Sequence, residues 1–162
     1  MAGPHTLAET ERAVQTRLAG MDLDFEAMAI VSNLFRAANA VRNHLERSVL
    51  RPHDLTWTAF VVLWVTWIWE PIETRQIANE GGFSRATLSG VLTTLEGRGF
   101  VQRERSDTDG RLVLVRLTPA GRRLMKRLFP LFNDQERALV ASIPERRRAE
   151  AADRLRMLTI TA

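Results

Sequence analysis

Arginine side chains, which bind phosphate groups well, are concentrated in the middle of the chain. Residues 84–127 contain ten basic residues, nine of them arginines, against four acidic residues, which gives a net charge of +6. Residues 1–83 have a net charge of −3 and residues 128–162 one of +1, within a total of +4. Phosphate neutralisation supplies most non-specific affinity for nucleic acids, so this distribution favours a polyanionic partner. A solvated charged face is the alternative that charge alone leaves open.

The start of this basic segment has the pattern of a helix with one apolar face and one face of mostly small and polar residues. Ser84 is a good helix N-cap, and the helix is expected to run to about Arg98. Its inward face is marked by Leu88, Val91, Leu92 and Leu95. Its opposite face consists of Arg85, Ala86, Ser89, Gly90 and Thr93. Because glycine inside a helix costs up to ~1 kcal/mol relative to alanine, this small, polar face suggests that a partner approaches the backbone closely.

A basic hairpin is expected after this helix, and a shorter helix is expected before it. Residues 100–105 and 112–117 read as two strands joined by a turn over residues 106–111. The arms and turn of this hairpin carry Arg103, Arg105, Arg111 and Arg116. Residues 73–80 read as a short helix that ends at a turn containing Gly81 and Gly82.

Long helices are expected on both sides of this region. Thr6 and Glu9 have the spacing of a capping box for a helix to about Leu18, with Gly20 as its C-terminal cap. Apolar residues then recur at helical spacing from Phe25 to the stop at residues 51–52. This helix of about seven turns is long for so small a domain, so part of its apolar stripe is expected to face something outside the monomer.

Three further helices complete the expected mainly helical fold. Residues 55–69 are almost continuously apolar, which suits a buried helix, although the β-branched residues would also suit a strand. The run is shorter than the ~20 apolar residues that cross a bilayer. A long helix is expected after Pro119, with a kink at Pro130, and Pro144 suits the first position of a final helix.

Composition excludes several classes of protein and site. A chain of 162 residues with 45% hydrophobic and 26% charged residues is expected to form one globular domain, neither disordered nor embedded in a membrane. The absence of cysteine excludes disulfides, thiolate metal sites and cysteine nucleophiles. Residues 1–20 have no secretory signal pattern, so a cytoplasmic location is expected.

The order of short helix, turn, second helix and basic hairpin is that of a winged helix-turn-helix. In this order the chain resembles the MarR family of multiple antibiotic resistance regulators. The residues that carry the resemblance are Ile72, Ile77, Ala78, Ser84, Thr87, Leu88, Val91, Leu95, Glu96, Gly99, Phe100, Val101, Asp109, Gly110, Arg111, Leu117, Thr118, Pro119, Ala120 and Gly121.

The resemblance implies an intertwined homodimer with long N- and C-terminal dimerisation helices and a two-stranded β-wing. It divides the chain into N-terminal dimerisation helices (1–52), a DNA-binding lobe (53–121) and C-terminal dimerisation helices (122–162). It also implies a transcriptional regulator, usually a repressor, that binds a palindromic operator in double-stranded DNA and is released by a small aromatic or phenolic ligand. A winged-helix module that binds only proteins is the alternative, and its affinity would depend little on salt.

The expected DNA contacts lie on the second helix and the hairpin. The helix residues are Ser84, Arg85, Thr87, Ser89 and Thr93. The hairpin residues are Arg103, Arg105, Asp109 and Arg111. Arg111 could insert into a narrow minor groove, or could instead form a salt bridge with Asp109 that stiffens the turn; both can hold together. For Arg98 the favourable charge at a helix C-terminus is a sufficient explanation.

An effector site is expected between the dimerisation helices and the DNA-binding lobe, by analogy with the family. Its candidate residues are Arg36, His44, Trp57, Phe60 and Trp64. Indole rings and an arginine suit a flat anion. Tryptophans at helical spacing are also typical of an ordinary core, and this alternative stays open.

No pattern for catalysis or for a cofactor is present in the sequence. There is no nucleophile elbow and no phosphate-binding glycine loop. The three histidines, His5, His44 and His53, lack carboxylates at metal-ligand spacing. We therefore expect no enzyme activity, no cofactor and no metal.

Overall fold

The computed structural model describes residues 5–106 and 109–160, and the chain forms two compact units, Met1–Arg42 and Asn43–Ala162. Of the expected hairpin turn, Asp107 and Thr108 lie outside the described residues. The division at residues 52 and 121 that the family resemblance implies stays a prediction.

The first unit contains α1 (Leu7–Arg17) and most of α2 (Phe25–Leu45). Thr6 and Glu9 form the predicted capping box, in which the Thr6 hydroxyl accepts from the Glu9 N–H at 3.2 Å and the Glu9 carboxylate accepts from the Thr6 N–H at 2.7 Å. The predicted cap at Gly20 is wrong: α1 already ends at Leu18, whose N–H donates to the Val14 carbonyl. The Asn33 amide donates to the Glu11 carboxylate at 2.7 Å and ties α2 to α1.

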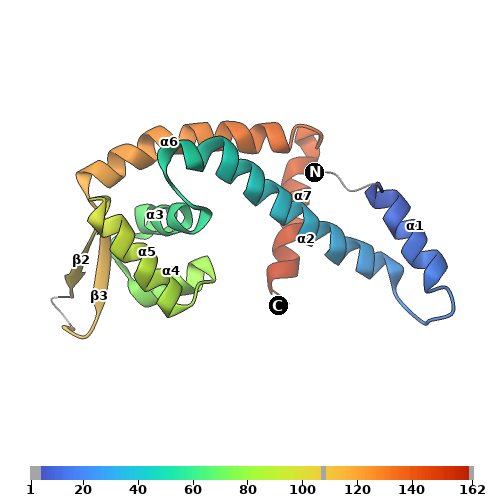
Figure 1. The fold of residues 1–162 in the computed structure, drawn as a ribbon, viewed down its shortest axis with the longest axis horizontal. Coiled ribbons are helices and arrows are strands. Elements are labelled where there is room, and N and C mark those ends of the chain that lie inside the picture. The colour runs from blue at the N-terminus through green and yellow to red at the C-terminus, as the bar shows by residue number, and fades with distance from the viewer. Residues whose placement is uncertain (1–4, 107–108, 161–162) are drawn as a thin grey trace. The chain divides into compact units, whose positions relative to one another are not determined.

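The second unit is built around α3 (Trp57–Trp69), so the helix expected over residues 55–69 is confirmed and the strand alternative is wrong. The end of α2 leads into a π turn, η1 (Glu46–Leu50), and a 3-10 turn, η2 (Arg51–His53). The other helices are α4 (Thr74–Gly81), α5 (Arg85–Gly97), α6 (Pro119–Leu139) and α7 (Glu145–Ile160). The α4–α5 pair and α6 pack against α3 from different sides (Figure 1).

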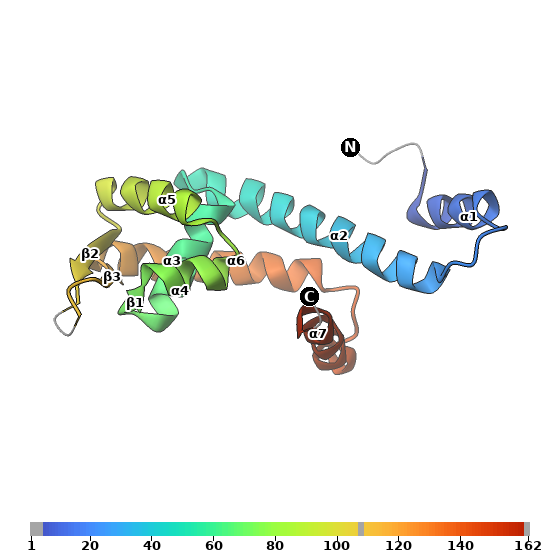
Figure 2. The same cartoon turned by 90° about the horizontal axis from the view of Figure 1, so that it is seen from below.

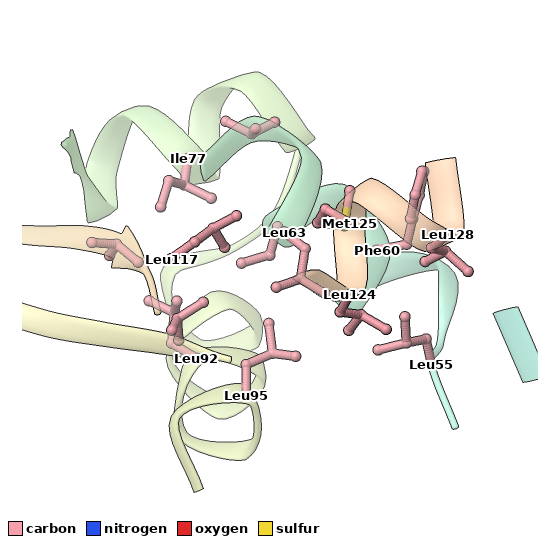
Figure 3. Packing of buried hydrophobic residues seen from close by; sticks show 14 of the residues in the cluster. Leu55, Phe60, Leu63, Ile77, Leu92, Leu95, Leu117, Leu124, Met125 and Leu128 are labelled. Atoms are coloured by element: carbon pink, nitrogen blue, oxygen red, sulfur yellow. The ribbon is translucent and has the colours of Figure 1, made fainter. Parts of the chain in front are cut away.

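The core is formed by apolar side chains from α3, α4, α5, α6 and the sheet, with η1 and the end of α2 adding to it. Figure 3 shows Leu63 of α3 among Leu92 and Leu95 of α5 and Leu124 and Met125 of α6. Each of these five side chains is almost completely buried. Burying a leucine-sized side chain stabilises the fold by about 1.5 to 3 kcal/mol, so this contact fixes the positions of α5 and α6 relative to α3.

The sheet has one strand more than expected. The strands β2 (Val101–Arg105) and β3 (Val113–Leu117) form the predicted antiparallel hairpin, and the two-residue β1 (Ile72–Glu73) pairs with the other edge of β3 (Figure 2). The sequence predicts Glu73 at the start of the first helix, whereas it lies in β1. A strand of two residues is too short to show the alternation of apolar and polar residues by which a strand is predicted.

A nearly buried carboxylate links three elements of the second unit. Glu70 ends α3, and its side chain is only 13% exposed. One carboxylate oxygen accepts from the Leu117 N–H of β3 at 2.7 Å, and the other pairs with the guanidinium of Arg122 in α6. Because a buried carboxylate needs both an opposite charge and hydrogen bonds, these partners make Glu70 a fixed junction between α3, the sheet and α6.

Gly121 provides a stability test of the contact between α6 and the sheet. A Cβ atom at Gly121 would lie 2.0 Å from the backbone oxygen of Phe100. We expect Gly121→Ala to lower the free energy of unfolding by about 1 to 3 kcal/mol, because overpacking forces the backbone to shift. Urea denaturation at one fixed protein concentration measures this change.

The matched control is Gly97→Ala, since an added Cβ there meets no atom within 4 Å. This substitution should stabilise the protein by up to about 1 kcal/mol through helix propensity. If both substitutions changed stability by the same amount and sign, the tight contact between Gly121 and Phe100 would not hold in solution.

Candidate nucleic-acid interface

A groove with a volume of about 480 Å³ lies between the start of α4, α5 and the β2–β3 hairpin. We call it the arginine groove. Its lining residues are Glu73, Thr74, Arg75, Arg85, Leu88, Ser89, Leu92, Arg103, Arg111, Leu112 and Val113. Four arginines and one carboxylate thus surround one concave surface, a charge balance that favours an anionic partner.

The N-terminus of α5 is held by two hydroxyl side chains. The Thr87 N–H donates to Ser84 Oγ at 3.1 Å, which confirms Ser84 as the N-cap. The Ser84 and Thr87 hydroxyls also lie 2.8 Å apart and share a hydrogen bond. Both residues remain exposed, so their predicted contact with DNA stays a prediction beside this structural role.

The two faces of α5 differ as the sequence predicts. Leu88, Leu92 and Leu95 are buried against α3 and the sheet. The residues of the opposite face are all exposed: Arg85, Ala86, Ser89, Gly90 and Thr93. A Cβ at Gly90 would meet no atom within 4 Å, so nothing inside the chain requires a glycine there.

The hairpin is attached to α5 by one carboxylate. The Glu96 carboxylate accepts from Nε of Arg103 at 3.0 Å and from the Arg103 backbone N–H at 3.2 Å. The hydrogen bond from the Arg103 side chain holds the pKa of Glu96 below its ordinary value of 4.5. Arg103 is therefore committed to a contact within the protein, and it stiffens the angle between hairpin and helix.

The remaining hairpin arginines lie in different surroundings. Arg111 is 94% exposed, and its Nε lies 3.4 Å from Asp109 Oδ1, so the predicted salt bridge is present and leaves the guanidinium accessible. The Arg111 N–H also donates to Asp109 at 3.0 Å. Arg116 pairs with Glu104 on the neighbouring strand, while Arg105 is exposed.

The family and its relatives agree with this architecture. The family model described as the MarR family matches residues 55–113, which include α3, α4, α5 and β2. The helix-turn-helix-type transcriptional regulator YwaE of Bacillus subtilis is 40% identical over 121 residues, which cover 75% of this chain and 71% of YwaE. The chain belongs to the MarR family. It is a transcriptional regulator of the MarR type.

Solved MarR-type structures share the fold. The MarR family regulator Sco3205 of Streptomyces coelicolor, solved in complex with DNA, superposes with a TM-score of 0.76 at 21% identity over 86% of this chain and 89% of Sco3205. BpsR of Bordetella bronchiseptica, whose DNA binding is regulated by 6-hydroxynicotinic acid, gives a TM-score of 0.72 at 24% identity over 80% of this chain and 98% of BpsR. These likenesses confirm the expected winged helix-turn-helix fold.

Two arginines of this MarR protein lie in surroundings that the sequence does not predict. Arg75 lines the arginine groove from α4, and the charge distribution does not predict it, because it lies outside the basic segment of residues 84–127. For Arg98 the helix C-terminus is not the whole explanation. Its guanidinium donates to the backbone oxygens of His53 and Asp54, and it stacks over the Phe100 ring at 4.9 Å.

The candidate effector residues are divided between the two units. Arg36 belongs to the first unit and lines a cavity of about 90 Å³ beside α1. His44 in the second unit forms a 2.8 Å hydrogen bond with Gln135 of α6.

The three aromatic residues of this candidate set pack against α6. Phe60 stacks on Phe132 at 4.2 Å between ring centroids, and Trp64 stacks on Phe129 at 4.5 Å. Trp57 lies 6.2 Å from the Phe132 ring. These rings therefore pack as core residues do, which is the alternative that the sequence leaves open. Their binding of an effector stays a prediction.

Within residues 5–106 and 109–160, no helix is both long and apolar enough to cross a bilayer. The same residues contain no group of three or more histidine, aspartate or glutamate side chains placed to hold a metal ion.

The Glu96–Arg103 ion pair predicts a specific dependence of stability on pH. Because the folded-state pKa of Glu96 is lowered, its contribution is present above pH 4.5 and is lost as the pH falls through the folded-state value. The stability advantage of the wild type over Glu96→Gln should therefore shrink as the pH falls below about 4.5. Both side chains are about one-third exposed, so the advantage should not exceed about 1 kcal/mol.

Urea denaturation at each pH measures this advantage. Repeating the measurement in 1 M NaCl should reduce it at neutral pH, since salt screens a partly exposed ion pair. An advantage that stayed constant with pH would show that the pair does not form in solution.

Proposed function

We propose that this MarR protein is a homodimeric repressor that binds a palindromic operator in double-stranded DNA, with α5 in the major groove and the hairpin against the backbone or minor groove. The arginine groove carries this proposal, since it joins the exposed face of α5 to the exposed guanidinium of Arg111. Each protomer would occupy one half-site, the two being about one helical turn apart. The structure of Sco3205 with DNA supports the assignment of partner.

Exposed apolar side chains support the homodimer. On α2, Ile30, Val31 and Phe35 are 56%, 63% and 71% exposed, and on α7 Leu155 is 52% exposed. Apolar stripes on helices are stable in water when a partner covers them. A second copy of the chain, which presents the same surface, is the partner that closed two-fold symmetry provides.

Salt dependence tests the proposal against a module that binds only proteins. The purified protein is titrated onto labelled duplex taken from the DNA that flanks its own gene, between about 50 and 200 mM salt, with fluorescence anisotropy as the readout. For a regulator that neutralises phosphates, the logarithm of the association constant falls linearly with the logarithm of the salt concentration. Absence of binding at the lowest salt, together with unaltered dimerisation, would favour the protein-interaction module.

Arg111→Ala tests the role of the hairpin. We expect operator affinity to fall by about 1 to 3 kcal/mol, because a minor-groove or phosphate contact is lost. Sedimentation velocity should show an unchanged dimer, since Arg111 is exposed at the hairpin turn. Unchanged affinity at every salt concentration would remove Arg111 from the interface.

We further propose that a small aromatic acid releases the repressor from DNA by favouring a different spacing of the two α5 helices. Regulation of BpsR by 6-hydroxynicotinic acid supports this chemistry. The candidate residues are Arg36, His44, Trp57, Phe60 and Trp64. A ligand on the α3 rings would have to replace part of their packing against Phe129 and Phe132.

The effector proposal is tested on the protein–operator complex with 6-hydroxynicotinic acid, salicylic acid and protocatechuic acid. One of these acids should dissociate the complex, and Trp57→Phe or Trp64→Phe should raise the concentration required at least tenfold. Trp69→Phe is the control, since Trp69 is 64% exposed and lies outside the candidate set. An unchanged response in both α3 variants would contradict the assigned site.

A further inference from the structure

We propose that the arginine groove holds a backbone phosphate of duplex DNA between Arg75 of α4 and Arg85 of α5, so that Arg75 is a DNA-contacting residue. This inference rests on the proposed function and adds to it a binding position on the first helix of the helix-turn-helix. The chemical group recognised is a phosphate, and its source is the DNA backbone.

The four arginines of the groove differ in how far they are already neutralised. Arg103 is bound to Glu96 through its side chain and its backbone. Arg111 has Asp109 at 3.4 Å. Arg75 and Arg85 are exposed and have no ion-pair partner among the described residues. The uncompensated positive charge of the groove therefore comes from Arg75 and Arg85.

The carboxylate of the groove does not cancel this charge. Glu73 precedes α4, and its N–H donates to the Gln76 side chain at 3.2 Å. One carboxylate beside two free guanidinium groups leaves a net positive charge. Arginines that line one concave surface without partners repel each other in the free protein, and an anion between them removes this repulsion.

The lining of the groove combines guanidinium donors with an apolar wall. Leu88 and Leu92 are the buried apolar side chains of this wall, and they offer no acceptor to the guanidinium groups. Arg75 and Arg85 approach from consecutive helices, and planar guanidinium groups can each donate two parallel hydrogen bonds to phosphate oxygens. The groove also opens beside the exposed face of α5, where the proposed major-groove contact begins.

The experiment uses the purified 162-residue chain and a labelled random-sequence duplex of about 30 base pairs, because a phosphate contact needs no particular base sequence. Affinity is measured by fluorescence anisotropy between about 50 and 200 mM KCl. Each protein–phosphate contact contributes about 0.9 to the slope of log K against log salt. Arg75→Ala should reduce the magnitude of this slope by about 1.8 for a dimer, since one phosphate contact is lost in each protomer.

Two variants control for charge and for folding. Arg127→Ala removes an exposed arginine of α6 that does not line the groove, and it should leave the slope unchanged. Arg75→Lys keeps the positive charge and should retain most of the slope. Thermal unfolding of each variant confirms that the fold is intact.

Two results would overturn the inference. One is an unchanged slope in Arg75→Ala, and the other is an equal loss in Arg75→Ala and Arg127→Ala.

The proposed function fails separately, if the wild type binds no duplex even at about 50 mM KCl. Loss of affinity in Arg111→Ala but not in Arg75→Ala would leave the proposed function standing and remove only Arg75 from it.

Discussion

The packing of one apolar helix, α3, positions the helices and the hairpin that surround the arginine groove in the second unit. The helices α4, α5 and α6 and the strand β3 all pack against it, and Leu63 lies at the centre of their shared core. Glu70 at its C-terminus binds β3 and Arg122 of α6. Since α5 and the hairpin both depend on α3, a movement of α3 would change the orientation of both, which gives a physical route from the aromatic residues of α3 to the arginine groove.

The basic residues of α4, α5 and the hairpin serve two different purposes. Arg103, Arg116 and Arg98 hold the protein together, through Glu96, Glu104 and the backbone oxygens of residues 53 and 54. Arg75, Arg85 and Arg111 keep accessible guanidinium groups on the arginine groove. The net charge of a segment counts paired and accessible arginines alike. The charge of +6 on residues 84–127 is therefore larger than the charge available to a ligand there, and it does not include Arg75.

Local and periodic features could be read from the sequence, whereas long-range pairings could not. The capping box of Thr6, the N-cap at Ser84 and the two faces of α5 each depend on residues within one or two helical turns. The strand β1, the junction at Glu70 and the link between Arg98 and residues 53–54 join positions more than 40 residues apart. No spacing rule predicts such contacts, since they exist only after the helices have packed.

Hydroxyl-radical footprinting of the purified protein on its operator tests the central claim most directly, because it reports where on the duplex each protomer lies. The account predicts two equivalent protected segments on one face of the DNA, with centres about one helical turn apart. A single protected half-site at saturation, or no protection at low salt, would contradict a dimer that places two copies of α5 and its hairpin on one duplex.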